Sequence, residues 1–176
     1  DDLSRGLGDV YKRQPFMSYQ NPDIALDNAA ELMRAGANMV KMEGGSWLCD
    51  SVGELIRNGI PVCAHLGLTP QSVNVFGGYK TQGKTDTAKQ QLLDDTKNLE
   101  SAGASLIVYE CIPAHLAELA TASTGMATIG IGAGAKTDGQ VLVAHDMLGM
   151  AKKPARFVKN FLSNSSSENP ILEAFS

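Results

Sequence analysis

Short apolar stretches alternate along the chain with longer segments in which apolar residues recur every third or fourth position. The short stretches predict β-strands at 38–42, 61–65, 105–109, 127–131 and 141–144. The longer segments predict helices at 51–58, 86–102, 113–122 and 154–162, besides a first helix that begins after Asn21 and stops at Gly36. Because strand and helix alternate throughout, the predicted sheet is parallel and the fold class is α/β.

The first helix has the clearest boundaries. Asn21 is a favourable N-cap residue, and Pro22 suits the first helical turn. Ala25 and Ala29 then recur on one face, and Gly36 ends the pattern.

Three segments depart from the strand and helix patterns. Residues 67–85 form a polar, glycine-rich connection, longer than is usual between a strand and a helix, and this indicates a lid or an assembly segment. Residues 163–167 are polar, and we expect them to be poorly ordered. Residues 1–14 lack the apolar strand pattern of their neighbours, so we expect them to pack poorly.

The number of predicted strands limits the architecture. Parallel strands alternating with helices often build a barrel of eight strands, which the predicted strands are too few to close. The chain therefore forms either an open sheet or part of a barrel.

Composition narrows the class of protein. At 176 residues with 43% hydrophobic and 19% charged residues, the chain is typical of one soluble globular domain. A net charge of -4 argues against a general nucleic-acid binder, and the basic pairs at 12–13 and 152–153 are too short to change this.

The cysteines and the hydropathy pattern favour a reduced, intracellular setting. Cys49, Cys63 and Cys111 form no CxxC pair, which argues against a zinc site and a disulfide framework. No apolar run approaches the roughly 18 residues of a membrane span, and the N-terminal segment lacks the apolar core of a signal peptide. We expect a cytoplasmic protein without membrane contact.

Candidate chemistry gathers where predicted strands end. Lys41 and Glu43 are two positions apart on one strand, so their side chains point to the same face. Gly44 and Gly45 follow, and we expect them to give a ligand close access. Glu43 suits a hard cation such as Mg²⁺, and Lys41 suits a substrate carboxylate. A buried ion pair or a solvated turn is the alternative interpretation.

Two further residues end predicted strands. Glu110 follows an apolar strand, and apolar surroundings make a carboxylate a stronger general base. Its alternative role is to cap the following helix. His65 also ends a strand, although a lone histidine is often a structural core group. The glycines at 130–134 suit either a phosphate cradle or, more economically, a tight turn.

Six segments taken together resemble one family, 3-methyl-2-oxobutanoate (ketopantoate) hydroxymethyltransferase. They occur in the family's order: VKMEGG at 40–45, HLGLTPQS at 65–72, FGGYK at 76–80, ECIP at 110–113, IGIGAG at 129–134 and TDGQVLV at 137–143. The resemblance runs from Pro15 to about Leu162.

This resemblance implies an enzyme of pantothenate biosynthesis with a (β/α)₈ barrel. Such an enzyme moves a one-carbon unit from 5,10-methylenetetrahydrofolate onto the keto acid 3-methyl-2-oxobutanoate to give 2-dehydropantoate, uses Mg²⁺, and assembles into a homo-oligomer. By resemblance, Glu110 matches the proton acceptor and Glu43 the metal-associated carboxylate. Lys41 matches the residue that binds the keto acid, and His65 matches a histidine of the substrate pocket.

The chain also departs from the family pattern. Family members carry about three more βα units ahead of Pro15, with two metal-binding aspartates among them. Where the family has an Asp-Leu pair, this chain has Arg13 and Gln14. We therefore expect residues 1–14 to be an artefactual, non-family segment, and residues 15–176 to be an incomplete TIM barrel of about the last five βα units that binds Mg²⁺ poorly. Alternatives are a lyase or mutase of the phosphoenolpyruvate/pyruvate barrel type and a non-catalytic fragment.

Overall fold

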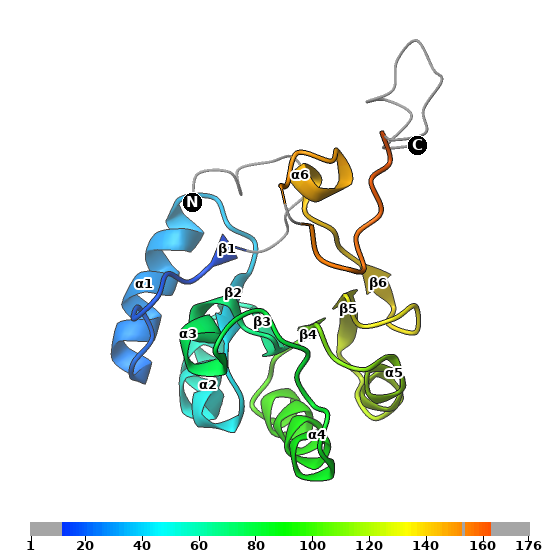
Figure 1. Cartoon of the computed structure of the whole chain (residues 1–176). Helices are drawn as coiled ribbons and strands as arrows, with labels where there is room; N and C mark the ends of the chain where they lie inside the picture. The colour runs from blue at the N-terminus through cyan, green and yellow to red at the C-terminus, as the bar shows by residue number, and fades with distance from the viewer. Residues whose placement is uncertain (1–11, 153, 163–176) are drawn as a thin grey trace. The chain divides into compact units, whose positions relative to one another are not determined.

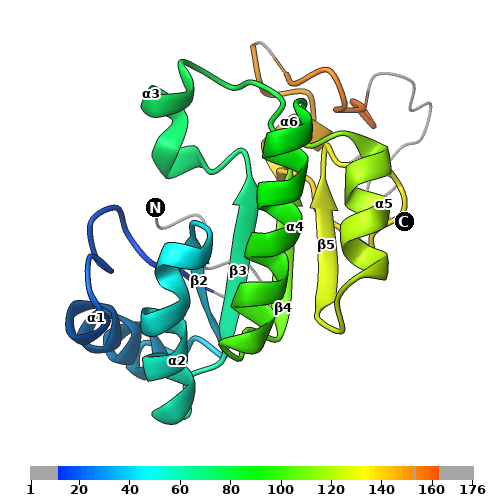
Figure 2. The ribbon, with the colours of Figure 1, turned by 90° about the horizontal axis from the view of Figure 1, so that it is seen from below.

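The computed structural model describes residues 12–152 and 154–162, and the chain divides into two compact units, Asp1–Gly139 and Gln140–Ser176. In the first unit, five strands pair in parallel in the order in which they occur along the chain: β1 (Lys12–Arg13), β2 (Val40–Glu43), β3 (Val62–Gly67), β4 (Leu106–Glu110) and β5 (Ala127–Ile131). A sixth short strand, β6 (Gly139–Gln140), follows β5 in the sheet order. Figure 2 shows β3, β4 and β5 side by side and pointing the same way.

Helices return the chain between these strands. They are α1 (Pro22–Arg34), α2 (Cys49–Arg57) after a 3₁₀ turn η2 (Ser46–Leu48), α4 (Asp86–Ser101) and α5 (Ala114–Ala122). They lie along one face of the sheet (Figure 1). Asn21 caps α1 by accepting a 2.9 Å hydrogen bond from the Ile24 amide, and Thr85 caps α4 in the same way through Ala88.

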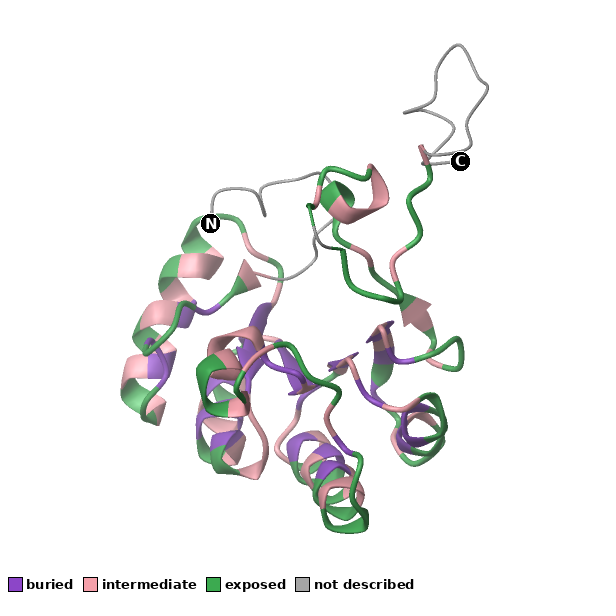
Figure 3. Cartoon of the chain, viewed as in Figure 1, coloured by how far each residue is buried: buried purple, intermediate pink, exposed green. Residues whose placement is uncertain are grey.

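The core fills the space between the sheet and these helices (Figure 3). Every residue of β2 is buried, as are the first five residues of β3. On the helix side, Ala25 and Ala29 of α1 are fully buried. Their small side chains let this helix pack closely.

Residues 12–14 correct one expectation. Lys12 and Arg13 pair with Val40 and Lys41 of β2, and the backbone N–H of Gln14 donates to the Lys41 carbonyl at 2.9 Å. Gln14 is fully buried, so the prediction of poor packing is wrong for this residue. The backbone of Lys12 and Arg13 is held by pairing with β2, while their side chains stay partly exposed or exposed. The polar side chains of Lys12 and Arg13 give no apolar strand pattern, so the sequence does not indicate this strand. It forms by backbone pairing with β2. Residues 1–11 lie outside the described part of the chain.

The long connection at 67–85 is more regular than expected. It contains a 3₁₀ turn, η3 (Pro70–Ser72), and a single helical turn, α3 (Val73–Phe76), which ends at Gly77 in the left-handed conformation. Pro70 fixes the backbone at the start of the 3₁₀ turn.

Two predictions fail in the second unit. A strand at 141–144 is absent; the pairing lies at Gly139–Gln140, and the Val143 carbonyl instead begins the short helix α6 (Ala144–Met147). The helix predicted at 154–162 is also absent from its described residues, which form turns and coil. Phe157 and Phe161 remain 43% and 37% exposed, so no apolar face is buried to stabilise a helix. The tail at 163–167 lies outside the described residues.

The α/β class is confirmed by the parallel sheet with its intervening helices. Among the residues described, we find no helix with the length and apolar character needed to cross a membrane.

Candidate functional site

The sheet brings three of the predicted residues to one edge. Glu43 ends β2 and lies opposite His65 of β3 in the strand register. Glu110 ends β4 and lies opposite Gly67, two residues beyond His65. Since carboxyl ends of parallel strands meet at the same edge, these side chains converge.

The His65 imidazole lies between the two carboxylates. Its Nε2 is 3.1 Å from Glu110 Oε2, and its Nδ1 is 3.6 Å from Glu43 Oε1. The side chains of His65 and Glu43 are almost fully buried, whereas that of Glu110 keeps 16% of its surface exposed. Glu110 is therefore the carboxylate of this pair that a substrate can reach.

Three buried polar atoms of this group lack a hydrogen bond among the described residues. They are both ring nitrogens of His65 and Oε1 of Glu43. Buried polar atoms are normally hydrogen-bonded, and exceptions concentrate where a ligand or a proton is handled. Here the three atoms lie in close contacts of the site, His65 with Glu43 and Glu110, and Glu43 with Arg13.

Glu43 is held in its ionised form. Burial opposes its ionisation, but the neighbouring His65, the Gln71 backbone N–H and the Arg13 guanidinium more than offset this, so the pKa of Glu43 lies below its ordinary value. The Gln71 N–H donates to Glu43 Oε2 at 2.9 Å, and Arg13 Nε lies 3.4 Å from Oε1.

Lys41 is the fourth predicted site residue, and it lies among the same charges. It is only 6% exposed, and burial followed by the repulsion of Arg13 lowers the pKa of its ammonium group. Glu43 and Glu110 act in the opposite direction, so both carboxylates lie within electrostatic reach of Lys41. The structure thus brings Lys41, Glu43, His65 and Glu110 together.

Sequence reasoning missed the part played by Arg13. From the sequence alone it is interpreted as part of a short basic pair, but its guanidinium lies 3.4 Å from buried Glu43 while 40% of its side chain remains exposed. Its neighbours Lys12 and Gln14 are polar, so the sequence offers no apolar strand pattern at this place.

The predicted role of Gly44 and Gly45 is wrong. A side chain at Gly44 would lie 2.7 Å from the indole of Trp47, and one at Gly45 would overlap the carboxylate of Asp95. These glycines make room for protein side chains instead of a ligand. Asp95 accepts a 2.8 Å hydrogen bond from the Ser46 amide and so fixes the turn.

The turn after Glu110 is constrained on both sides. Cys111 has a φ of 49°, a left-handed conformation that is costly for a residue with a Cβ. Its N–H donates to the Ile131 carbonyl, and the Leu68 N–H donates to the Glu110 carbonyl at 2.8 Å. These backbone hydrogen bonds fix the end of β4, from which the Glu110 side chain extends at the edge of the sheet.

The glycines at 130–134 fit the tight-turn interpretation. Gly132 and Gly134 both have positive φ, and a side chain at Gly134 would collide with Ala114 of α5. Glycine is needed there for close packing.

The described residues do not fit a magnesium site. Within residues 12–152 and 154–162, no three acidic, histidine or cysteine side chains are grouped to hold a metal ion. Mg²⁺ prefers an octahedron of oxygen ligands, whereas Glu43 Oε1 faces the nitrogens of Arg13 and His65. A site built on Glu43 would need oxygen ligands from outside the described residues.

Comparison with known proteins shows the family of the chain. The sequence model of the family described as "Ketopantoate hydroxymethyltransferase" matches residues 9–176. The chain is 58% identical over 154 residues to "3-methyl-2-oxobutanoate hydroxymethyltransferase 2" of Hahella chejuensis (strain KCTC 2396), covering 87% of this chain and 58% of that protein. It is also 58% identical over 155 residues to "3-methyl-2-oxobutanoate hydroxymethyltransferase" of Yersinia enterocolitica, covering 88% of this chain and 58% of that protein.

A solved structure supports the fold. A candidate phosphonomutase from Burkholderia cenocepacia J2315 superposes with a TM-score of 0.53 at 14% identity, over 68% of this chain and 52% of that chain. At this identity the likeness concerns the fold alone, and the fold agrees with a partial (β/α)₈ barrel. It lends no separate support to a phosphoenolpyruvate-type function.

Proposed function

Because the chain belongs to the ketopantoate hydroxymethyltransferase family, we propose that it forms part of an enzyme that adds a hydroxymethyl group to 3-methyl-2-oxobutanoate, giving 2-dehydropantoate for pantothenate biosynthesis. The chain spans 58% of the length of the relatives reported above, so the activity of the whole protein is a proposal for this chain. The donor implied by the family name is a one-carbon folate, 5,10-methylenetetrahydrofolate.

One observation carries the proposal: the carboxylate of Glu110, 3.1 Å from the His65 imidazole and within electrostatic reach of buried Lys41. The reaction needs a base that removes the C3 proton of the keto acid, and a carboxylate that is partly exposed at the mouth of the site suits this task. The enolate so formed makes a carbon–carbon bond to the methylene carbon of the folate, and both carbon–nitrogen bonds of that methylene break. Water supplies the hydroxyl group of the product, and the two released nitrogens of tetrahydrofolate take one proton from water and one from Glu110.

Each remaining side chain has a proposed part. Lys41 attracts the keto-acid carboxylate, because it is a cation at the base of the same site. His65 orients Glu110 and is close enough to share its proton. Glu43 is the proposed metal-associated carboxylate, and the remaining oxygen ligands would come from outside the described residues.

The setting of the enzyme follows from the same resemblance. We propose that it works in the cytoplasm as a homo-oligomer. Cys49, Cys63 and Cys111 are all free thiols, which fits a reducing compartment.

Keto-acid binding to the 176-residue chain tests the proposal. Saturation-transfer NMR with 3-methyl-2-oxobutanoate is expected to show binding that Lys41→Met weakens about tenfold or more, since a charge-assisted contact is lost. Glu110→Gln is expected to leave binding nearly unchanged, because the base acts after the substrate binds. Lys136→Met is the matched control, since Lys136 is exposed. Equal binding by the Lys41 and Lys136 variants would contradict the proposal.

A further inference from the structure

A cavity of about 250 Å³ lies beside the candidate site, and the reaction described so far does not use it. Its wall includes Phe16, Met17, Tyr19, Trp47 and Gln71, and Glu43 contributes to it. The cavity is thus bounded by a largely apolar surface that meets one carboxylate of the site.

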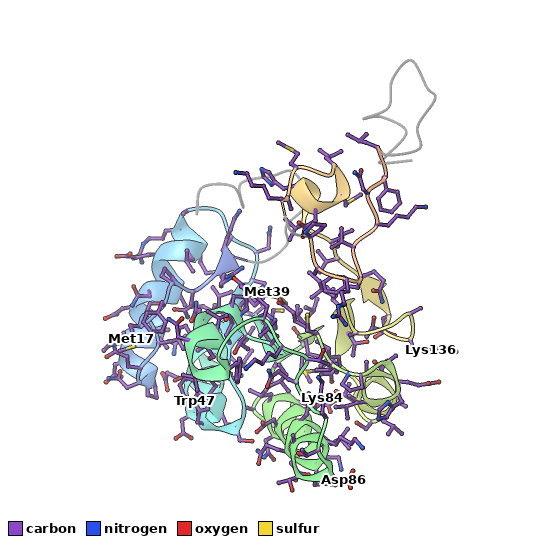
Figure 4. All side chains as sticks on the ribbon, in the orientation of Figure 1. Met17, Met39, Trp47, Lys84, Asp86 and Lys136 are labelled. Atoms are coloured by element: carbon purple, nitrogen blue, oxygen red, sulfur yellow. The ribbon has the colours of Figure 1, made fainter. Side chains whose placement is uncertain are left out.

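Trp47, labelled in Figure 4, is exposed and yet held in place by its neighbours. Its side chain is 63% exposed. The indole lies against Gly44, where no side chain would fit, and stacks on Tyr19 with ring centroids 6.2 Å apart and planes inclined by 16°. An exposed aromatic ring that is fixed by its neighbours presents a preorganised flat surface to a ligand.

The opposite wall is also exposed and apolar. Phe16 and Met17 are 69% and 57% exposed, and Met17 has a left-handed φ of 62°. Such strain persists only where surrounding bonds enforce it, and it is common at ligand sites. Here Gln20 Nε2 donates to the Met17 carbonyl at 2.6 Å, and Ser18 Oγ donates to the Pro15 carbonyl at 2.7 Å.

Polar contacts join this cavity to the candidate site. The Tyr19 hydroxyl donates to the Gln71 side chain, and Gln71 Nε2 donates to the Gln14 carbonyl at 2.8 Å. The Gln71 backbone N–H in turn holds Glu43. A molecule in the cavity would therefore contact Glu43, which lies at the same edge of the sheet as His65 and Glu110.

We propose that this cavity binds the flat heterocyclic ring of the reduced folate co-substrate, stacked on Trp47. The inference rests on the proposed function, which requires a folate beside the keto acid. Pockets for whole drug-sized ligands measure about 300–1,000 Å³, so a cavity of about 250 Å³ suits the ring system and leaves the polar tail of a folate outside. The aromatic face binds the ring by stacking, and the Gln71 and Tyr19 groups provide polar atoms at its edge.

Calorimetric titration of the 176-residue chain with 5-formyltetrahydrofolate tests this proposal. This reduced folate has no methylene group to transfer, so binding is measured apart from reaction. Trp47→Ala is expected to weaken binding about tenfold or more, and Trp47→Phe to restore most of it because a flat ring remains. Leu119→Ala is the control, since Leu119 is 56% exposed on α5 and does not line the cavity. Because Trp47 is the chain's single tryptophan, quenching of its fluorescence reports the same event.

The outcomes separate this inference from the proposed function. Folate binding that Trp47→Ala leaves unchanged overturns the inference, while Lys41-dependent keto-acid binding still supports the function. Loss of both folate and keto-acid binding overturns both. If Trp47→Ala instead changes the oligomeric state in sedimentation and folate does not bind, this surface belongs to an interface between copies of the chain and the inference is wrong.

Discussion

Glu43 shows how a single residue joins the fold to the site. Its backbone belongs to β2, its Oε2 accepts the Gln71 amide, and its Oε1 faces His65 and Arg13. A buried carboxylate with these neighbours is stabilised as the anion, in spite of the cost of burying charge. The same residue is therefore structural as well as a candidate for chemistry.

We predict that Glu43 makes the fold sensitive to acid. Its pKa in the folded chain lies below the ordinary value of 4.5, so its contribution to stability is present above about pH 4.5 and is lost as the pH falls through the folded pKa. Urea unfolding at a series of pH values is expected to show a steeper loss of stability below pH 4.5 for the parent chain than for Glu43→Gln. Glu31→Gln, at an exposed position of α1, is the control and should follow the parent. Parallel curves for the parent and the Glu43 variant would count against this account.

At the scale of elements, the carboxyl ends of β3 and β4 approach each other closely at Gly67 and Glu110. Gly67 has a φ of +89°, and a side chain there would overlap the backbone carbonyl of Glu110. The adjacent Leu68 N–H donates to that carbonyl at 2.8 Å. The position of Glu110 is thus set by a glycine on the neighbouring strand.

Gly67→Ala is predicted to be far more costly than a glycine replacement elsewhere. Gly59 also has a positive φ, +77°, but no atom lies within 4 Å of an added side chain there, so Gly59→Ala measures conformational strain alone, about 1 kcal/mol. Gly67→Ala adds a steric clash with a backbone atom, and we expect a loss of about 3 kcal/mol or more in the free energy of unfolding, measured by denaturant titration. Equal losses at the two positions would show that the clash is relieved without cost.

The sequence predicted most elements because their signals were local. The strand at 127–131 was predicted with its observed bounds, and the helix that begins at Asp86 ends within one residue of its predicted end. The strand at Lys12–Arg13 could not be predicted, since it depends on pairing with a strand about 28 residues later in the chain. The helix predicted near 154–162 is absent although the sequence has helical periodicity there. Phe157 and Phe161 stay partly exposed, so tertiary packing does not stabilise a helix.

The sequence predicted those residues of the site that lie at or near the ends of strands. Lys41, Glu43, His65 and Glu110 could be placed at one edge from the parallel alternation alone. The contact of Arg13 with Glu43 joins two strands that are far apart in the sequence, and that of Trp47 with Gly44 places a side chain against backbone. No spacing rule describes either contact.

At the scale of the molecule, the chain corresponds to part of the length of its relatives. It spans 58% of the length of its Hahella relative, and its parallel strands agree with part of a (β/α)₈ barrel. In such a barrel the active site takes residues from the ends of several strands. The described residues supply the proposed base, a buried lysine and a histidine, whereas no group of three metal-ligating side chains is found among them.

We therefore predict that activity depends on restoring the remaining strands. A chimaera that carries the corresponding upstream part of the Hahella relative ahead of Pro15 is expected to form 2-dehydropantoate from the keto acid and methylenetetrahydrofolate, and the 176-residue chain alone to form little. In the chimaera, Glu110→Gln keeps the shape of the side chain but cannot accept the C3 proton, and loss of a general base lowers the rate by about 10²–10⁴. Exchange of the C3 proton for deuterium, followed by NMR without folate, isolates this step; Glu31→Gln should leave it unchanged. Unaltered exchange in the Glu110 variant would remove the proposed base, and rapid turnover by the 176-residue chain would show that the described strands already hold a complete site.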